Sequence, residues 1–142
     1  MLQLVRIEGA LPEGFAALRA AADAEGFRAM ARLQAEWEPG GGGFVCLLAA
    51  FQDGTLAGVG GLTPESDGQE EEPAMRVRRL YVAPEMRRTG VGRTLVNALL
   101  QEALDTVSLV TLNGRDTLAP RFWTELDFRA VEGRPWTHEF RF

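Results

Sequence analysis

A strand, a glycine-containing loop and an amphipathic helix follow one another between Leu80 and Ala103, and this segment constrains the fold most strongly. The strand ends at Val82, because Pro84 cannot donate to a sheet ladder. Gly90 and Gly92 remove side chains where the backbone turns into the helix. The helix has a clear apolar stripe of Val91, Leu95, Leu99 and Ala103. The pattern predicts a strand–turn–helix unit.

The start of this helix is predicted to bind an anion. Its first amides have no intrahelical acceptor and lie at the positive end of the helix dipole. Arg87, Arg88 and Arg93 add positive charge. Two such glycines could equally serve only a tight turn. A dinucleotide-binding loop is a weaker alternative, because Leu95 occupies the third glycine position and Asp116 fits the acidic ribose partner only loosely.

Composition narrows the classes of function. The 142 residues contain no lysine, which excludes a P-loop and Schiff-base catalysis. One cysteine, Cys46, and one histidine, His138, cannot build an ordinary His/Cys zinc site, so no metal is expected. The net charge of −5 argues against nucleic acid as a partner. Cys46 is expected in the core, with a reactive thiol as the alternative.

A cytoplasmic protein with no membrane partner is expected. No apolar run reaches the roughly 20 residues that cross a bilayer, and the start lacks a signal-peptide layout. Residues 1–74 carry a net charge of −8 and residues 75–142 a net charge of +3. This asymmetry suits an anionic cofactor in one half and a cationic acceptor near the other, although a solvated acidic surface explains it as well.

Periodicity predicts the order β-α-α-β-β-β-α-β-α-β-β. We expect a single α/β (α+β) domain over residues 1–142, a mixed sheet flanked by helices on both faces. Asp53-Gly54 is a hairpin signal, and Pro64–Pro73 is predicted to be a loop. The expected strands are Leu2–Ile7, Phe44–Phe51, Thr55–Leu62, Met75–Val82, Val107–Leu112, Phe128–Val131 and Trp136–Phe142. The other helices are expected from Pro12, over Phe27–Trp37 and over Leu118–Leu126.

Two blocks resemble the GNAT family of N-acetyltransferases. Leu80–Pro84 followed by Arg87-x-x-Gly90-x-Gly92 is similar to the central motif of that family, R/Q-x-x-G-x-G/A. Ala119–Phe128 resembles the family block A-x-x-F-Y-x-x-L-G-F. The resemblance is close over roughly residues 75–131, and the order of the remaining elements agrees with it.

The resemblance implies acetyl-CoA as co-substrate and a role for each matching position. Backbone groups of Leu80, Tyr81 and Val82 would run alongside the pantetheine arm. The Val82 amide would stabilise charge on the thioester oxygen. Asp116 stands where many members have an asparagine that faces the cofactor. The remaining positions implied to bind it are Arg87, Arg88, Thr89, Gly90, Val91, Gly92, Arg93, Thr94 and Phe122.

The catalytic half of the pattern is incomplete. Trp123 occupies the position of the usual tyrosine acid, and an indole N–H is not a practical proton donor. Tyr81 is the only tyrosine and is expected to pack or line the site. For the base, Glu72 is chosen from the glutamates 70–72, which could equally form a solvated loop. His138 is the other candidate, because it titrates near neutrality.

The sequence therefore predicts an N-acetyltransferase that acts on a primary amine by direct attack in a ternary complex. The acceptor would be a small molecule, cationic by the charge argument, or a peptide. The alternative is a catalytically weak or silent acyl-CoA-binding regulatory module, which Trp123 favours. Nucleotide binding without CoA is a more remote reading. A homodimer would be in keeping with the family, many of whose members pair through sheet edges.

Overall fold

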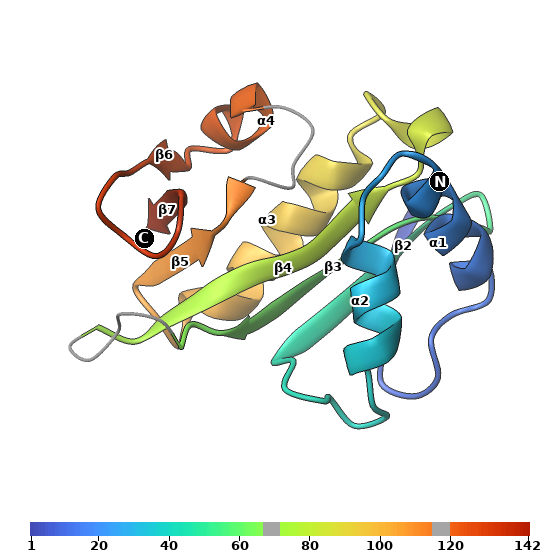
Figure 1. Ribbon diagram of the computed structural model, residues 1–142, viewed down its shortest axis with the longest axis horizontal. Helices are drawn as coiled ribbons and strands as arrows, with labels where there is room; N and C mark the ends of the chain where they lie inside the picture. Colours follow the sequence, from blue (N-terminus) through green and yellow to red (C-terminus); the bar gives the residue numbers. More distant parts are fainter. Residues whose placement is uncertain (67–71, 115–119) are drawn as a thin grey trace.

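The computed structural model describes residues 1–66, 72–114 and 120–142, and these form one sheet with helices on both faces (Figure 1). The strand order is β1-β2-β3-β4-β5-β7-β6. The elements are β1 (Leu2–Arg6), α1 (Phe15–Ala24), α2 (Ala29–Glu36), β2 (Cys46–Gln52), β3 (Thr55–Pro64), β4 (Ala74–Val82), the 3₁₀ helix η1 (Pro84–Met86), α3 (Val91–Leu104), β5 (Leu109–Leu112), α4 (Pro120–Glu125), β6 (Arg129–Ala130) and β7 (His138–Arg141).

The predicted fold class and element order are confirmed, and η1 is the one addition within the described residues. The hairpin between β2 and β3 turns at Asp53 and Gly54, whose φ angles are 50° and 85°. The first helix begins at Phe15 rather than at Pro12, after Gly14 in the left-handed region. None of the described helices is long and apolar enough to cross a membrane.

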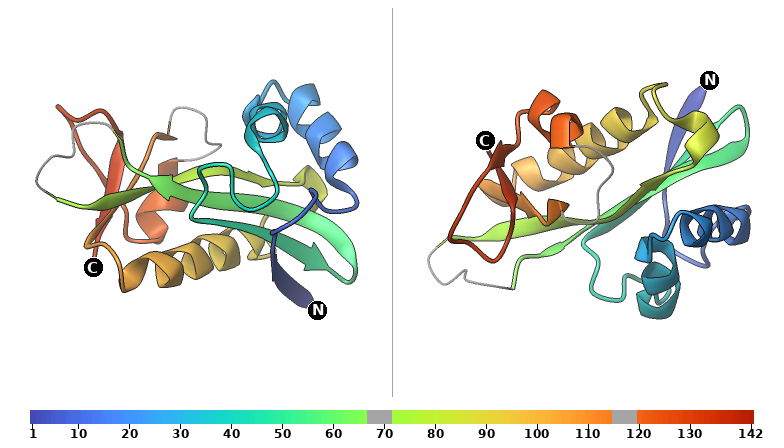
Figure 2. Two further views of the ribbon diagram at one scale, coloured as in Figure 1. Left: turned by 90° about the horizontal axis from the view of Figure 1, so that it is seen from below. Right: turned by 45° about the horizontal axis from the view of Figure 1, so that its top comes forward.

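Helices lie on both faces of the sheet (Figure 2), and a hydrophobic core lies between the sheet and the helices on each side. Helix α3 covers one face and buries its stripe completely, with Leu95 and Leu99 fully excluded from solvent. Helices α1 and α2 cover the other face, through Phe15, Leu18 and Met30 among others. Cys46 lies in the core under α3, and burial raises the pKa of its thiol, in keeping with a packing role.

Strands β4 and β5 diverge after a short parallel contact. Only Ala74–Arg76 of β4 pairs with Leu109–Thr111 of β5. From Val77 to Val82, no strand of the described chain pairs with this edge of β4. The separation leaves backbone donors and acceptors of β4 facing open space beside the start of α3.

A β-bulge interrupts β4 and changes which side chains face which helix. Tyr81 pairs with Val59 and Arg78 with Gly61, so two residues of β4, Arg79 and Leu80, lie opposite one residue of β3. Arg79 has a φ of 58°, in the left-handed region. Bulges of this kind re-aim side chains and are frequent next to active sites.

Side chains on the two sides of the bulge alternate out of phase. Before it, Val77 packs in the α3 core while Arg78 lies on the opposite face. After it, Val82 packs against the α3 core and Tyr81 in the α1–α2 core. Arg79 pairs with Glu36 of α2, so consecutive arginines of β4 both lie on the α2 side.

Candidate functional site

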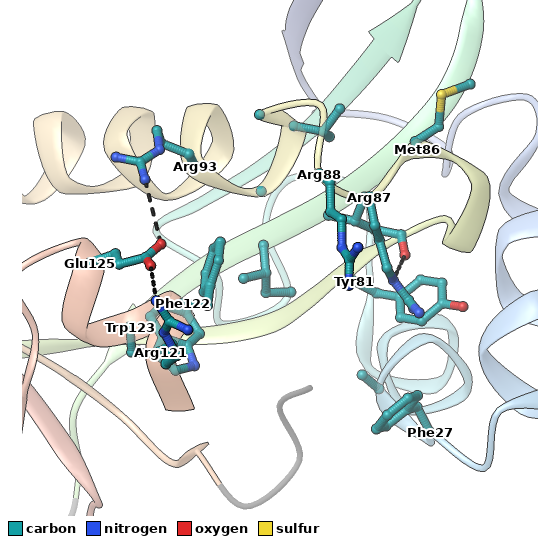
Figure 3. Close-up of a pocket in the computed structure, with 16 residues that line it drawn as sticks. Phe27, Tyr81, Met86, Arg87, Arg88, Arg93, Arg121, Phe122, Trp123 and Glu125 are labelled. Atoms are coloured by element: carbon teal, nitrogen blue, oxygen red, sulfur yellow. Dashed lines mark hydrogen bonds and ion pairs between the residues drawn. The ribbon is translucent and has the colours of Figure 1, made fainter. Parts of the chain in front are cut away.

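A hollow of about 660 Å³ lies between the open end of β4 and helix α4 (Figure 3). We call it the main hollow. Figure 3 shows Phe122 and Trp123 of α4 on one side and Tyr81 and Arg88 on the other. The lining residues are Phe27, Ala29, Leu80, Tyr81, Val82, Met86, Arg87, Arg88, Gly90, Val91, Gly92, Arg93, Arg121, Phe122, Trp123 and Glu125.

The backbone of Val82 faces the main hollow. The amide of Ala83 donates to the Ala57 carbonyl of β3 at 2.8 Å. Because backbone groups of consecutive strand residues point to opposite edges, the N–H and carbonyl of Val82 point away from β3. A hydrogen bond supports this direction, because Arg87 Nε donates to the Val82 carbonyl at 3.2 Å and Arg87 is not part of β3. A hydrogen-bond donor therefore lies on the open edge of β4.

The start of α3 supplies further amides. Gly90 caps the helix with a φ of 89°, and the first helical hydrogen bond joins the Thr94 amide to the Gly90 carbonyl at 3.0 Å. The amides of Val91, Gly92 and Arg93 precede this bond and have no acceptor within the helix. The Thr94 hydroxyl also donates to the Gly90 carbonyl, at 2.8 Å. Free amides at the positive end of a helix dipole are suited to binding an anion.

Close packing explains why position 92 carries glycine. A Cβ there would lie 3.1 Å from ring carbons of Phe122 and 3.6 Å from Val82 Cγ2. Phe122 in turn contacts Trp123, with ring centroids 4.9 Å apart. The aromatic block of α4 thus approaches α3 through Gly92, so the two motifs noted in the sequence meet in one site.

Glu25 joins α1 to this site, and no sequence pattern pointed to it. Arg87 donates to both of its carboxylate oxygens, at 2.8 and 2.6 Å, and the Tyr81 hydroxyl donates at 2.5 Å. Arg87, and secondly Tyr81, lower the pKa of Glu25 to about 2. Burial, and then the hydrogen bond to Glu25, raise the pKa of Tyr81. Tyr81 therefore keeps its proton near neutral pH and holds α1 against β4.

Arg88, Arg93 and Arg121 supply the remaining positive charge of the main hollow. Glu125 is the one acidic residue among the described lining residues. Its carboxylate oxygens lie 3.9 Å from Nη2 of Arg93 and 3.8 Å from Nη2 of Arg121, and more than half of its side chain is exposed. Such long, solvated pairs leave both guanidiniums free to turn toward an anionic ligand.

The base candidates of the sequence lie elsewhere or outside the described residues. Glu72 accepts hydrogen bonds from Arg141 at 2.6 Å and Ser108 at 3.0 Å, and lines neither hollow. Arg141 lowers the pKa of Glu72. His138 lies in β7 beside the Thr137 hydroxyl, and burial lowers its pKa. Glu70, Glu71 and Asp116 fall outside the described residues.

A second hollow of about 350 Å³ adjoins the first on the side of α2. It shares Phe27, Ala29, Leu80 and Trp123 with the main hollow. We call it the arginine hollow, because it is lined by Arg28, Arg32, Arg76, Arg78 and Arg79. The sequence did not reveal it, since these arginines come from two segments far apart in the chain, the first turns of α2 and the part of β4 up to and including its bulge.

Comparison with known proteins gives a family and several related folds. The model of the acetyltransferase (GNAT) family matches residues 12–128. No curated protein sequence matches the chain.

Solved structures resemble the chain along almost its whole length. An Exiguobacterium protein assigned as an acetyltransferase has 24% identity and a TM-score of 0.82, covering 99% of this chain and 93% of its own. A Brucella melitensis GNAT acetyltransferase in complex with acetyl-CoA has 18% identity and a TM-score of 0.70, covering 100% and 88%. An Escherichia coli GNAT N-acetyltransferase in complex with CoA has 17% identity and a TM-score of 0.66, covering 99% and 81%. These likenesses show a shared fold.

Proposed function

The chain belongs to the GNAT acetyltransferase family, and we propose that it binds acetyl-CoA and transfers the acetyl group to a primary amine. One observation carries the proposal. The open edge of β4, with the Val82 amide, and the start of α3, which no side chain caps, line the same hollow. A thioester needs a hydrogen-bond donor at its oxygen and a pyrophosphate needs clustered amides, and this hollow offers both.

Acetyl-CoA fits the groups that the chain supplies. The amides of Val91, Gly92 and Arg93 would bind the pyrophosphate, with the side chains of Arg93 and Arg121 adding charge. The Thr94 amide is already used within the helix, because it donates to the Gly90 carbonyl. The pantetheine amides would pair with the open edge of β4 at Leu80 and Val82, like an added strand. The Brucella and Escherichia coli relatives bind acetyl-CoA and CoA, which supports this ligand. The side chain of Arg87 has a different role, because Glu25 holds it.

The transfer needs little from the protein beyond position and one hydrogen bond. A neutral amine attacks the thioester carbon within a ternary complex, and negative charge develops on the thioester oxygen. The Val82 N–H stabilises that charge. The amine loses a proton and the CoA sulfur leaves as a thiolate, which is a fair leaving group.

Water handles the protons in this proposal. The Tyr81 hydroxyl keeps its proton and donates a hydrogen bond to Glu25, so it is not an acid for this reaction. Trp123 carries only an indole N–H, which is not a practical acid either. Glu72 is held by Arg141 away from both hollows, so we leave it out of the mechanism. Glu125 is the only described lining carboxylate, and it lies among the arginines that would bind the pyrophosphate.

A silent acyl-CoA-binding module is the second candidate function. Trp123 favours it, since it is 1% exposed and fills the position where an acid would be expected. Two measurements separate the candidates. Calorimetry gives the affinity for acetyl-CoA, and thiol release from acetyl-CoA is followed with a panel of polyamines, aminoglycosides, amino acids and peptide N-termini. Tight binding without thiol release for any amine would leave the silent module. Absence of acetyl-CoA binding would refute both.

A further inference from the structure

We propose that the arginine hollow binds an anionic group of the acceptor, so that the amine to be acetylated also carries a carboxylate or a phosphate. The inference rests on the proposed function, because it takes the hollow beside the thioester as the acceptor site. It replaces the cationic acceptor that the acidic N-terminal half of the chain suggested.

The charge of the hollow is only partly balanced. Its described lining contains five arginines and no acidic residue. Arg76 binds Glu65 at 2.7 Å, and Arg79 binds Glu36 through two hydrogen bonds of 2.8 and 2.6 Å. These two arginines have structural partners, and they join β4 to the neighbouring elements.

The other three arginines have no such partner. In the described parts of the chain, no carboxylate lies within ion-pair distance of Arg28, Arg32 or Arg78. Arg78 is half-buried, and its Nε donates to the Thr63 hydroxyl at 3.0 Å. Burial, followed by the like charges of Arg76 and Arg79, lowers the pKa of Arg78. An anion in the hollow would stabilise this guanidinium.

The start of α2 adds neutral donors to the same hollow. The helix begins at Ala29, and no side chain caps it. Its first amides lack intrahelical acceptors, and residues 26–29 line the hollow. Charged side chains surround these amides, because Arg28 and Arg32 flank the start of α2 and Arg78 lies on the facing strand β4. Guanidinium groups match carboxylate and phosphate oxygens with paired hydrogen bonds.

The position of the hollow suits an acceptor. Leu80 and Trp123 line both hollows, so the two are adjacent at the end of β4 where the thioester would lie. An amine held by its anionic end among the arginines could extend past Leu80 toward Val82. A volume of about 350 Å³ is within the range of small-molecule sites. Glu36 and Glu65, whose charges act on Arg78, bind the structural arginines Arg79 and Arg76.

Matched pairs of amines test the inference. Thiol release from acetyl-CoA is measured with β-alanine against its amide, 3-aminopropanamide, and with 2-aminoethyl phosphate against ethanolamine; spermidine represents a cationic acceptor. We expect kcat/KM to be at least about tenfold higher for one anionic member than for its neutral partner, as a charge-assisted hydrogen bond would give. The two pairs also distinguish carboxylate from phosphate.

Arg32→Gln and Arg78→Gln should bring the ratio within the preferred pair close to one. Arg129→Gln is the matched control, because Arg129 is an exposed arginine of β6 that lines neither hollow. The ratio should stay at the wild-type value in this control. Acetyl-CoA affinity is measured for each variant, so that a general loss of folding is recognised.

The outcomes separate this inference from the proposed function. Efficient acetylation of spermidine or ethanolamine, with no preference for an anionic partner, would overturn the inference and leave the transferase intact. If no amine releases thiol, calorimetry measures the binding of β-alanine and 2-aminoethyl phosphate to the acetyl-CoA-loaded protein directly. Binding that Arg78→Gln abolishes would support the anion site, and absence of binding would refute it.

Discussion

At Gly90 and Gly92 the same residue type meets two different requirements. Gly90 has a φ of 89° and open space around it, so the conformation of the backbone requires glycine. Gly92 has no such φ, but Phe122 occupies the space of its missing side chain. The sequence showed the two glycines as one motif. In the structure, Gly90 permits the conformation of the loop, and Gly92 allows Phe122 of α4 to pack closely against α3.

Gly90→Val should weaken acetyl-CoA binding by more than about tenfold, since valine disfavours the left-handed backbone at Gly90 that presents the first amides of α3. A β-branched residue in the left-handed region should also cost about 1–2 kcal/mol of stability. Gly54→Val is the control, because Gly54 has a φ of 85° and equally open space in the β2–β3 hairpin. Calorimetry and urea unfolding compare them. Equal affinity in both variants would refute the pyrophosphate site.

Trp123 should not be a proton donor in the reaction. It is buried between Phe122 and Phe128, and its Nε1 has no hydrogen-bond partner in the described structure. Trp123→Phe keeps an aromatic ring and removes the N–H, so we expect kcat within about threefold of wild type, whereas loss of a general acid costs about 100-fold or more. A 100-fold fall in kcat with unchanged acetyl-CoA affinity would assign catalysis to the indole.

At the level of elements, Glu25 and the bulge of β4 decide how the site is assembled. Glu25 follows the last turn of α1 and ties it to Tyr81 of β4 and to Arg87 beyond η1. Because of the bulge at Arg79 and Leu80, a few residues of β4 pack in the α3 core and line both the main hollow and the arginine hollow. Neither feature follows from hydrophobic periodicity, because both depend on contacts between distant segments.

The link through Glu25 should make stability depend on pH in acid. Its pKa is about 2 in the folded protein and about 4.5 when free of partners. A depressed folded pKa stabilises the protein fully above about pH 4.5, and this contribution is lost as the pH falls toward 2. Glu25→Gln should therefore unfold more easily than wild type at pH 7, with the difference shrinking between pH 4.5 and 2.

Urea unfolding of wild type and Glu25→Gln at several pH values measures this difference. Glu13→Gln is the control, since Glu13 is an exposed acid just before α1 with no ion pair among the described residues. A difference between wild type and Glu25→Gln that stays constant down to pH 2 would show that the carboxylate charge does not hold α1.

At the scale of the whole molecule, local patterns predicted much and long-range geometry little. The stripe of α3 and the hairpin at Asp53 depend on neighbouring residues, and both are confirmed. The resemblance to the GNAT family is confirmed by the family model. The arginine hollow could not be predicted, because it needs α2, β4 and the separation of β4 from β5 to be placed together.

The unpaired edge of β4 also bears on the behaviour of the free protein. Exposed strand edges are templates for aggregation, and proteins usually protect them with charges, bulges or a covering segment. Here the edge from Val77 to Val82 carries two arginines and a bulge, and it faces a hollow beside α4. Charges and a bulge of this kind disfavour pairing of an open edge with another chain. Under the proposed function, the features that disfavour pairing with another chain lie on the same edge that would bind the pantetheine arm.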